Sequence, residues 1–293
     1  MPPDGRSASR VRTFPLIAPS VGVLLVWMIV PLAMTLWFSF RRYNLLNPML
    51  TGFAGLNNYR FLIRDPALPA ILITTVVIVL AILLITISAG VVLAVVFNSG
   101  FPGQGIARVL MISPFFVMPT VSALIWKNLL MHPVNGLFAG VMRGLGFTAI
   151  DWFGSWPLSS IIIIVSWEWL PFAFLILLTA LQSLDEEQLE AARLDGAGSL
   201  AVFFFIQVPH MARAISVLVM METIFLLGIF AEIYVTTAGG PGIATTNLPF
   251  LIYQRALLAF NVGSASAAGV IAIILANVMA ALLIRTIARR LDV

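Results

Sequence analysis

Residues 71–97 read ILITTVVIVLAILLITISAGVVLAVVF, a stretch without a single charged side chain. A helix needs about 20 apolar residues to cross the roughly 30 Å of hydrocarbon in a bilayer. The many β-branched residues do not indicate a strand here, because a helix satisfies all of its backbone hydrogen bonds within one segment, whereas an open strand in lipid cannot. The stretch therefore predicts a membrane-spanning helix.

Five further stretches combine a similar length with few charges. The first of them follows several arginines, as a signal peptide would. Its apolar run is longer than the roughly 7–15 residues of such a segment, however, and no A-x-A-like cleavage site follows it. We therefore interpret it as a retained span. The five stretches lie at 14–38, 106–130, 157–181, 213–236 and 263–286. The sequence thus predicts an all-α integral membrane protein with about six transmembrane helices.

The composition excludes several other classes of protein. Of the 293 residues, 61% are hydrophobic and only 10% are charged, whereas a soluble domain carries about 25% charged residues. A bilayer, and so membrane lipid, is the expected surrounding. The net charge of +4 comes without any basic run, so no nucleic-acid partner is expected. The absence of cysteine excludes disulfides, iron–sulfur clusters, thiolate zinc sites and cysteine nucleophiles, and we expect no metal site.

An even number of spans places both termini on one side of the membrane. With the termini in the cytoplasm, nine of the 16 basic residues lie inside and seven lie outside, a small excess in the direction of the positive-inside rule. The chain then divides into a cytoplasmic tail, a periplasmic loop, a membrane core and a second cytoplasmic tail, at 1–13, 39–70, 71–286 and 287–293.

The loop at 182–212, QSLDEEQLEAARLDGAGSLAVFFFIQVPHMA, is the one long polar segment with helix-forming residues. Acids at 185–187 suit a helix start, because they complement the positive end of the helix dipole. Gly196 and Gly198 allow a turn after that helix. We expect two short helices joined at a glycine bend, with the carboxylate of Glu190 available to an arginine on a partner.

The spacing within this loop resembles a known motif. Glu190-Ala191-Ala192, three residues, Gly196, nine residues and then Ile206-Gln207-Val208-Pro209 is similar to the EAA loop, E-A-A-x3-G-x9-I-x-L-P, of ABC importer permeases. Only Val208 departs from the pattern. The resemblance implies a type I ABC importer transmembrane domain in the bacterial inner membrane. It also implies that the loop is a cytoplasmic coupling helix that docks on an ATP-binding subunit. The residues expected to serve this docking are Glu190, Ala191, Ala192, Arg193, Asp195 and Gly196.

Other stretches resemble the carbohydrate-uptake branch of these permeases, which includes the maltose and glycerol-phosphate systems. Residues 53–59 are similar to F-x-G-L-x-N-Y, and residues 237–241 to T-G-G-G-P, with Ala238 where a glycine is usual. The resemblance implies import of a sugar, polyol or sugar derivative by alternating access. It also implies that Gly239, Gly240 and Pro241 form a periplasmic loop.

The resemblance also implies partners. The chain has no G-x-x-x-x-G-K-[ST] phosphate loop, so we expect it to have no catalytic residues, to bind no cofactor and to hydrolyse no ATP by itself. Two copies of an ATP-binding subunit would supply ATP and Mg²⁺. A second permease subunit, in a heterodimer or a homodimer, and an extracytoplasmic solute-binding protein would complete the transporter.

Two acids, Glu168 and Glu222, fall well inside predicted spans. A charge at mid-bilayer costs at least about 2.5–3.5 kcal/mol, so each should face protein or a water-filled cavity. Carboxylates suit vicinal sugar hydroxyls, and Trp167 or Trp169 could stack on the apolar face of a sugar. Phe225 lies three residues after Glu222, on the same helix face, and is a further candidate for the substrate path. The alternative is that the two acids only hydrogen-bond to neighbouring helices.

Three other interpretations stay open at this point. An ion-coupled secondary transporter would use broken helices and repeats, and the EAA spacing has no reason to occur in one. An intramembrane enzyme would need clustered His, Cys or paired acids. The same fold could also carry an amino acid, a phosphonate or a peptide.

Overall fold

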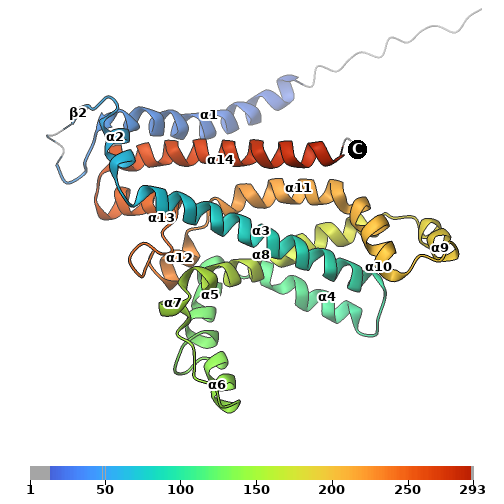
Figure 1. Cartoon of the computed structure of the whole chain (residues 1–293). Coiled ribbons are helices and arrows are strands. Elements are labelled where there is room, and N and C mark those ends of the chain that lie inside the picture. Colours follow the sequence, from blue (N-terminus) through green and yellow to red (C-terminus); the bar gives the residue numbers. More distant parts are fainter. Residues whose placement is uncertain (1–13, 48, 50, 292–293) are drawn as a thin grey trace, which may run out of the picture.

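The computed structural model describes residues 14–47, 49 and 51–291. The expected tail at 1–13, with its arginines, and the last two residues of the tail at 287–293 lie outside the described part. The described chain is mostly helical. Its long helices are α1 (Phe14–Ser39), α3 (Leu68–Asn98), α8 (Pro157–Leu181), α11 (Val208–Leu226) and α14 (Val262–Leu291). These helices lie side by side in Figure 1.

Shorter elements connect these helices. They are β1 (Arg41–Arg42), β2 (Gly52–Phe53), α2 (Asn57–Arg64), α4 (Gln104–Ile112), η2 (Ser113–Phe116), α5 (Pro119–Ile125), η3 (Trp126–Leu130), α6 (Leu137–Gly144), α7 (Trp152–Ser155), α9 (Glu186–Leu194), α10 (Ser199–Val202), η4 (Phe203–Gln207), α12 (Ala231–Thr236), α13 (Leu248–Tyr253) and η5 (Gln254–Leu258).

Helices α3, α8 and α11 form the centre of the bundle. Their buried apolar side chains make two clusters, one around Ile82 and Val165 and one around Phe174. Gly90 explains how close α3 and α8 come: a methyl group there would lie 3.1 Å from Cβ of Ala173. In lipid, helices associate through such close backbone packing rather than through hydrophobicity.

Helix α1 lies at the edge of the bundle, against α14. Its outer side chains are exposed, with Trp27 79% accessible. An apolar surface of this kind suits lipid or another membrane subunit rather than water.

The third predicted span, 106–130, is corrected by the structure. The chain does not cross as one straight helix, because the segments Gln104–Phe116 and Pro119–Leu130 meet at an angle of 106°. Val117 and Met118 are extended at the bend. Pro119 accounts for the conformation of Met118, since a residue directly before proline avoids the helical region. The described residues therefore contain five straight candidate spans and this bent pair, which makes up to six.

The fifth predicted span, 213–236, also has different bounds. The helical run begins at Ser199 and ends at Leu226, and α12 is a separate helix after a break that contains Gly228. Pro209 lies in the first turn of α11, where a proline is tolerated, and the wide turn of η4 leads directly into that helix. The polar part of the loop at 182–212 consequently ends near Gly198.

Side chains of the 53–59 motif form hydrogen bonds with the end of α1. The side-chain amide of Asn58 donates hydrogen bonds to the carbonyls of Ser39 and Arg41, at 2.8 and 2.9 Å, and the Tyr59 hydroxyl donates to Ser39 Oγ at 2.7 Å. The Asn58 amide thereby provides donors for backbone carbonyls at and just beyond the end of α1, where the helix leaves carbonyls without partners. Gly263, at the start of α14, packs so close to the Arg41 carbonyl that a methyl group there would clash.

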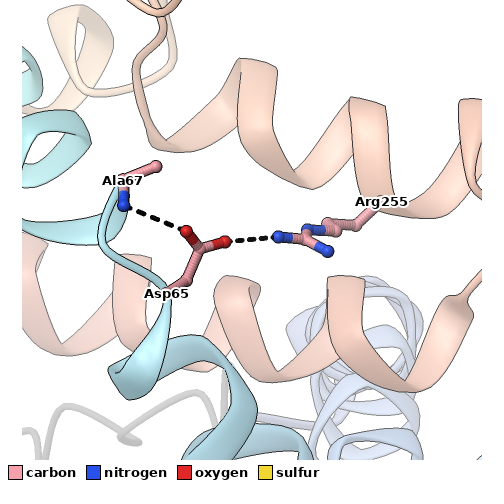
Figure 2. Close-up of polar contacts among 3 residues, drawn as sticks. All are labelled: Asp65, Ala67 and Arg255. Carbon is pink, nitrogen blue, oxygen red and sulfur yellow. Dashed lines mark hydrogen bonds and ion pairs between the residues drawn. The ribbon is translucent and has the colours of Figure 1, made fainter.

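One ion pair joins the start of α3 to η5. Arg255 Nη2 lies 2.6 Å from Asp65 Oδ2, and the other carboxylate oxygen of Asp65 accepts a hydrogen bond from the Ala67 amide (Figure 2). The Arg255 guanidinium also lies 5.4 Å from the centre of the Phe61 ring. This half-buried contact fixes the segment between α13 and α14 against the loop before α3.

Candidate functional site

The EAA motif forms helix α9 and a glycine turn. Glu186 and Glu187 occupy the first turn and Arg193 the last, so the charges complement both ends of the helix dipole. Gly196 ends the helix with φ at +84°. Its amide bonds to the Arg193 carbonyl at 3.0 Å, and the Ala197 amide bonds to the Ala192 carbonyl at 2.9 Å. This is a Schellman motif, in which the left-handed residue is usually glycine.

Helix α9 stands at one end of the molecule, away from the packed bundle (Figure 1). None of its residues is buried, and Leu194 is 89% accessible. A cavity of about 550 Å³ separates α9 from the end of α3, and Glu190 and Arg193 line it together with Asn98. Within the described chain, the Glu190 carboxylate makes no ion pair. It is therefore free to accept hydrogen bonds from another subunit.

The predicted coupling residues thus form one segment that is exposed except at Ala192, which is half-buried. Ala191 and Asp195 are exposed as well, with Asp195 at the end of the helix. An exposed leucine follows the turn, Leu200, which is 75% accessible. Exposed leucines on both sides of a tight turn make an apolar rim around the polar helix, and such a mixture of apolar and polar side chains is typical of a docking surface.

Glu222 lies in the middle of the bundle. Its side chain has no accessible surface, and Oε2 accepts a hydrogen bond of 2.7 Å from the Thr86 hydroxyl on α3. Its other oxygen, Oε1, has no partner within the described chain. In this conformation Glu222 therefore links α11 to α3, and it does not reach a solvent-filled path.

Glu168 has different surroundings. It is 6% accessible, and its Oε1 has no hydrogen-bond partner within the described chain. No hydrogen bond joins the two intramembrane acids to each other within the described chain. Glu232, which is 5% accessible, is a buried residue of α12.

Trp167 and Phe225, two of the aromatic residues predicted to lie near the cargo, have different neighbours. Trp167 packs on Trp126, with ring centres 5.7 Å apart, in a buried cluster beside α7. Phe225 stacks instead on Trp169, at 5.2 Å. Trp169 in turn contacts Phe115 and Phe172, at 6.1 and 5.8 Å.

These four rings, Phe115, Trp169, Phe172 and Phe225, form what we call the aromatic cluster. It joins α8 and α11 to the bend in the third span, and Phe225 is 56% accessible. The sequence left Trp167 and Trp169 as alternatives, and the structure places Trp169 in this cluster beside Phe225. The spacing of three residues between Trp169 and Phe172 puts these two on one helix face, and it is a signal that could have added Phe172.

The 237–241 turn is packed and hydrogen-bonded by side chains that follow it in the sequence. Gly239 has φ at +86°, and a methyl group there would lie 2.6 Å from the Phe250 ring and from Thr246 Oγ1. The Thr246 hydroxyl donates to the Gly239 carbonyl, and the Thr245 hydroxyl to that of Gly240, each at 3.1 Å. Ala238, at the position where a glycine is usual, also has a positive φ, of 49°.

Taken together, the apolar bundle, the bent span and the exposed polar helix at one end are features of a membrane transport subunit. The chain belongs to the family described as the binding-protein-dependent transport system inner membrane component, whose pattern matches residues 53–293. The membership that the EAA motif predicted is thereby confirmed, as is the all-α membrane fold.

Relatives of known name support this membership. The chain is 32% identical to the probable ABC transporter permease protein y4oQ of Sinorhizobium fredii, over 85% of its own length and 81% of the relative's. It is 33% identical to the trehalose/maltose transport system permease protein MalF of Thermococcus litoralis, over 85% of each chain.

A solved structure shows the same fold. It is that of a bacterial ABC transporter involved in the import of the acidic polysaccharide alginate, with a TM-score of 0.80 over 95% of this chain and 96% of that one, at 19% identity.

Proposed function

We propose that this chain is the permease subunit of an ATP-driven, binding-protein-dependent importer of a sugar, polyol or sugar derivative. The single observation that carries the transport mechanism is the exposed α9 helix, closed by the left-handed Gly196. The names of a relative and of the alginate transporter support a carbohydrate as the cargo. A non-sugar solute on the same fold is the alternative that the experiment below must exclude.

The coupling role follows from the surroundings of Glu190. An exposed carboxylate beside a cavity of about 550 Å³ can accept hydrogen bonds from basic side chains of an ATP-binding subunit. ATP and Mg²⁺ would be held by two copies of that subunit, and this chain would bind no cofactor. When the two copies close on ATP, the motion would reach the spans through α9 and the helical run from Ser199 to Leu226.

The same assignment orients the chain. If α9 is cytoplasmic, both termini are cytoplasmic as well, since the start of α1 and the end of α14 point toward the end of the molecule where α9 lies (Figure 1). The turn at Gly239, Gly240 and Pro241 then lies on the periplasmic side and faces a solute-binding protein. A second permease subunit, different from this one or a copy of it, would cover the exposed apolar faces.

The aromatic cluster is the best candidate for contact with cargo. Aromatic rings present apolar faces that stack on the C–H face of a sugar ring. Phe225 and Trp169 meet beside the bend of the third span, where a second subunit would complete a path. Glu222 and Glu168 are both buried in the conformation described. They would therefore support this surface and would not contact the cargo directly.

The test of the cargo is ATP-dependent uptake in proteoliposomes that contain the complete transporter and its binding protein. We expect uptake of a carbohydrate such as trehalose or maltose, and a several-fold rise in KM when Phe225 is replaced by Ala. The matched control is Ile224→Ala, which truncates the exposed side chain next to Phe225, 62% accessible, and should leave KM unchanged. Uptake of amino acids but of no carbohydrate would contradict the proposal.

A further inference from the structure

The segment that carries α9 leaves the bundle and returns to it at neighbouring points. Helix α8 ends at Leu181 and α11 begins at Val208, and residues 182–207 between them, which we call the coupling segment, contain α9, α10 and η4. Helices α8 and α11 pack on each other, and α9 stands beyond their ends (Figure 1). A displacement of α9 can therefore reach both helices, provided that the two points of attachment do not move apart.

Apolar side chains keep the two points of attachment close on the inner side. Leu181, Leu184 and Met211 are buried, each 8% accessible or less, in the cluster around Phe174. Leu189 of α9 packs against the same cluster. Apolar burial is not directional, so it keeps the two points together without fixing their exact positions.

His210 supplies a directional contact on the outer side. Its Nε2 lies 3.1 Å from the carbonyl oxygen of Ala180 and 3.0 Å from Oγ of Ser183. Because a carbonyl only accepts hydrogen bonds, Nε2 carries the ring hydrogen and donates it to Ala180, with Ser183 Oγ as a second acceptor. The Ser183 hydroxyl in turn donates to the Ala180 carbonyl at 2.7 Å. The imidazole of α11 thus bonds to the last turn of α8 and to the first residues of the coupling segment.

The end of α8 is a favourable place for such a donor. The last carbonyls of a helix have no partners within the helix, and the negative end of the helix dipole attracts a hydrogen-bond donor. Among the side-chain hydrogen bonds of the described chain, those of His210 are the ones that join the end of α8 to the start of α11. His210 and Ser183 line a cavity of about 550 Å³, so no packed side chain would replace the contact if the imidazole were removed.

We infer that His210 is a positioning residue for the coupling segment. Its hydrogen bonds to Ala180 and Ser183 hold the end of α8 and the start of α11 together, so that α9 passes its displacement to both helices at once. We call this contact the loop clasp. The step from the contact to coupling rests on the proposed importer, whereas the contact itself does not.

The contact can be tested by hydrogen–deuterium exchange of the intact transporter. The amides of Gln182, Ser183 and Leu184 bond to carbonyls of the last turn of α8, so their exchange reports the opening of this end. We expect His210→Ala to speed exchange in the peptide 180–186 about fivefold, as for the loss of one hydrogen bond. His210→Gln, whose amide nitrogen can take the place of Nε2, should exchange at close to the wild-type rate.

Thr179→Ala is the matched control. The exposed hydroxyl of Thr179 lies in the same last turn of α8, but it bonds only within the helix, to the Leu175 carbonyl at 2.8 Å. Its loss should leave exchange in the peptide 180–186 within about twofold of wild type. Equal exchange rates in the wild-type protein and in His210→Ala would overturn the loop clasp.

The role in coupling is measured as the cargo imported per ATP hydrolysed, in proteoliposomes that contain the complete transporter. We expect His210→Ala to lower this ratio about threefold, and the thermal midpoint to stay within about 2 °C of wild type. His210→Gln should restore the ratio. A purely structural role would lower the midpoint and leave the ratio unchanged, and that result would overturn the positioning role.

Failure of the loop clasp can be distinguished from failure of the proposed function. If the wild-type transporter imports no carbohydrate, the proposed function fails, and the exchange rates still decide whether the clasp exists. If carbohydrate uptake is normal and His210→Ala changes neither the exchange rate nor the ratio, the clasp fails and the proposed importer stands.

Discussion

Gly196 and Gly239 have nearly the same backbone conformation, with φ at +84° and +86°, but opposite surroundings. Nothing lies within 4 Å of a methyl group built on Gly196, whereas one built on Gly239 would collide with Phe250 and Thr246. The first glycine follows the exposed helix α9, and the second lies in the turn closed by its own threonines. The turn at Gly196 therefore leaves free space that a partner could occupy, whereas the turn at Gly239 is filled by side chains of this chain.

The largest effect on stability is expected for Gly239→Ala. The substitution adds the cost of a left-handed alanine, about 1–2 kcal/mol, and overpacking against Phe250, about 1–3 kcal/mol. We expect the thermal midpoint of the purified transporter to fall by about 5–10 °C. An unchanged midpoint would mean that the turn is less closed than its contacts indicate.

A smaller loss is expected for Glu222→Ala. It removes the hydrogen bond from Thr86 and leaves a void between α3 and α11, which together should cost about 1–3 kcal/mol of stability. Glu222→Gln keeps an acceptor for Thr86 and should cost less. Thermal unfolding of both variants, combined with Thr86→Val in a double-mutant cycle, measures the contact. A change in transport KM without any loss of stability would instead favour the direct cargo role that the sequence suggested.

Gly196→Ala isolates the open turn. Because the site has free space, only the conformational cost remains, about 1–2 kcal/mol on the α9 turn. We expect the midpoint of the bundle to stay within about 2 °C of wild type, while ATP-driven uptake falls because the end of α9 shifts. A fall in the midpoint as large as that of Gly239→Ala would break the contrast between the two turns.

The smallest expected effect is an increase in stability, for Ala238→Gly. Ala238 has a positive φ, which glycine adopts without steric cost. Ala238→Gly should therefore stabilise the turn by about 0.5–1 kcal/mol after the added entropy of the unfolded chain is subtracted. Differential scanning fluorimetry should show a thermal midpoint that is higher by a few degrees at most. A lower midpoint would contradict the proposed backbone strain at Ala238.

Much of this architecture is readable in the sequence, because hydropathy and the EAA spacing are local signals. The glycine bend of the coupling loop follows from Gly196 alone. The bend in the third span is not apparent from hydropathy, which does not register that Pro119 keeps Met118 out of the helical region.

Contacts between distant segments could not be predicted in the same way. Trp167 and Trp169 differ by two positions and face different neighbours, and only packing shows that Phe225 meets Trp169. The position of α12 depends on the break after α11, which separates α12 from the span that the sequence predicts to extend to residue 236.

The central claim is that α9 transmits ATP-driven motion to the spans through Glu190. The most direct measurement compares Glu190→Ala with Glu187→Ala, a neighbouring acid on the same exposed helix, in reconstituted transporters supplied with the ATP-binding subunit. We expect Glu190→Ala to lower ATP-driven carbohydrate uptake at least about tenfold, as for the loss of a charge-assisted contact, and Glu187→Ala to stay within about twofold of wild type. Wild-type uptake together with normal co-purification of the ATP-binding subunit in Glu190→Ala would contradict the account.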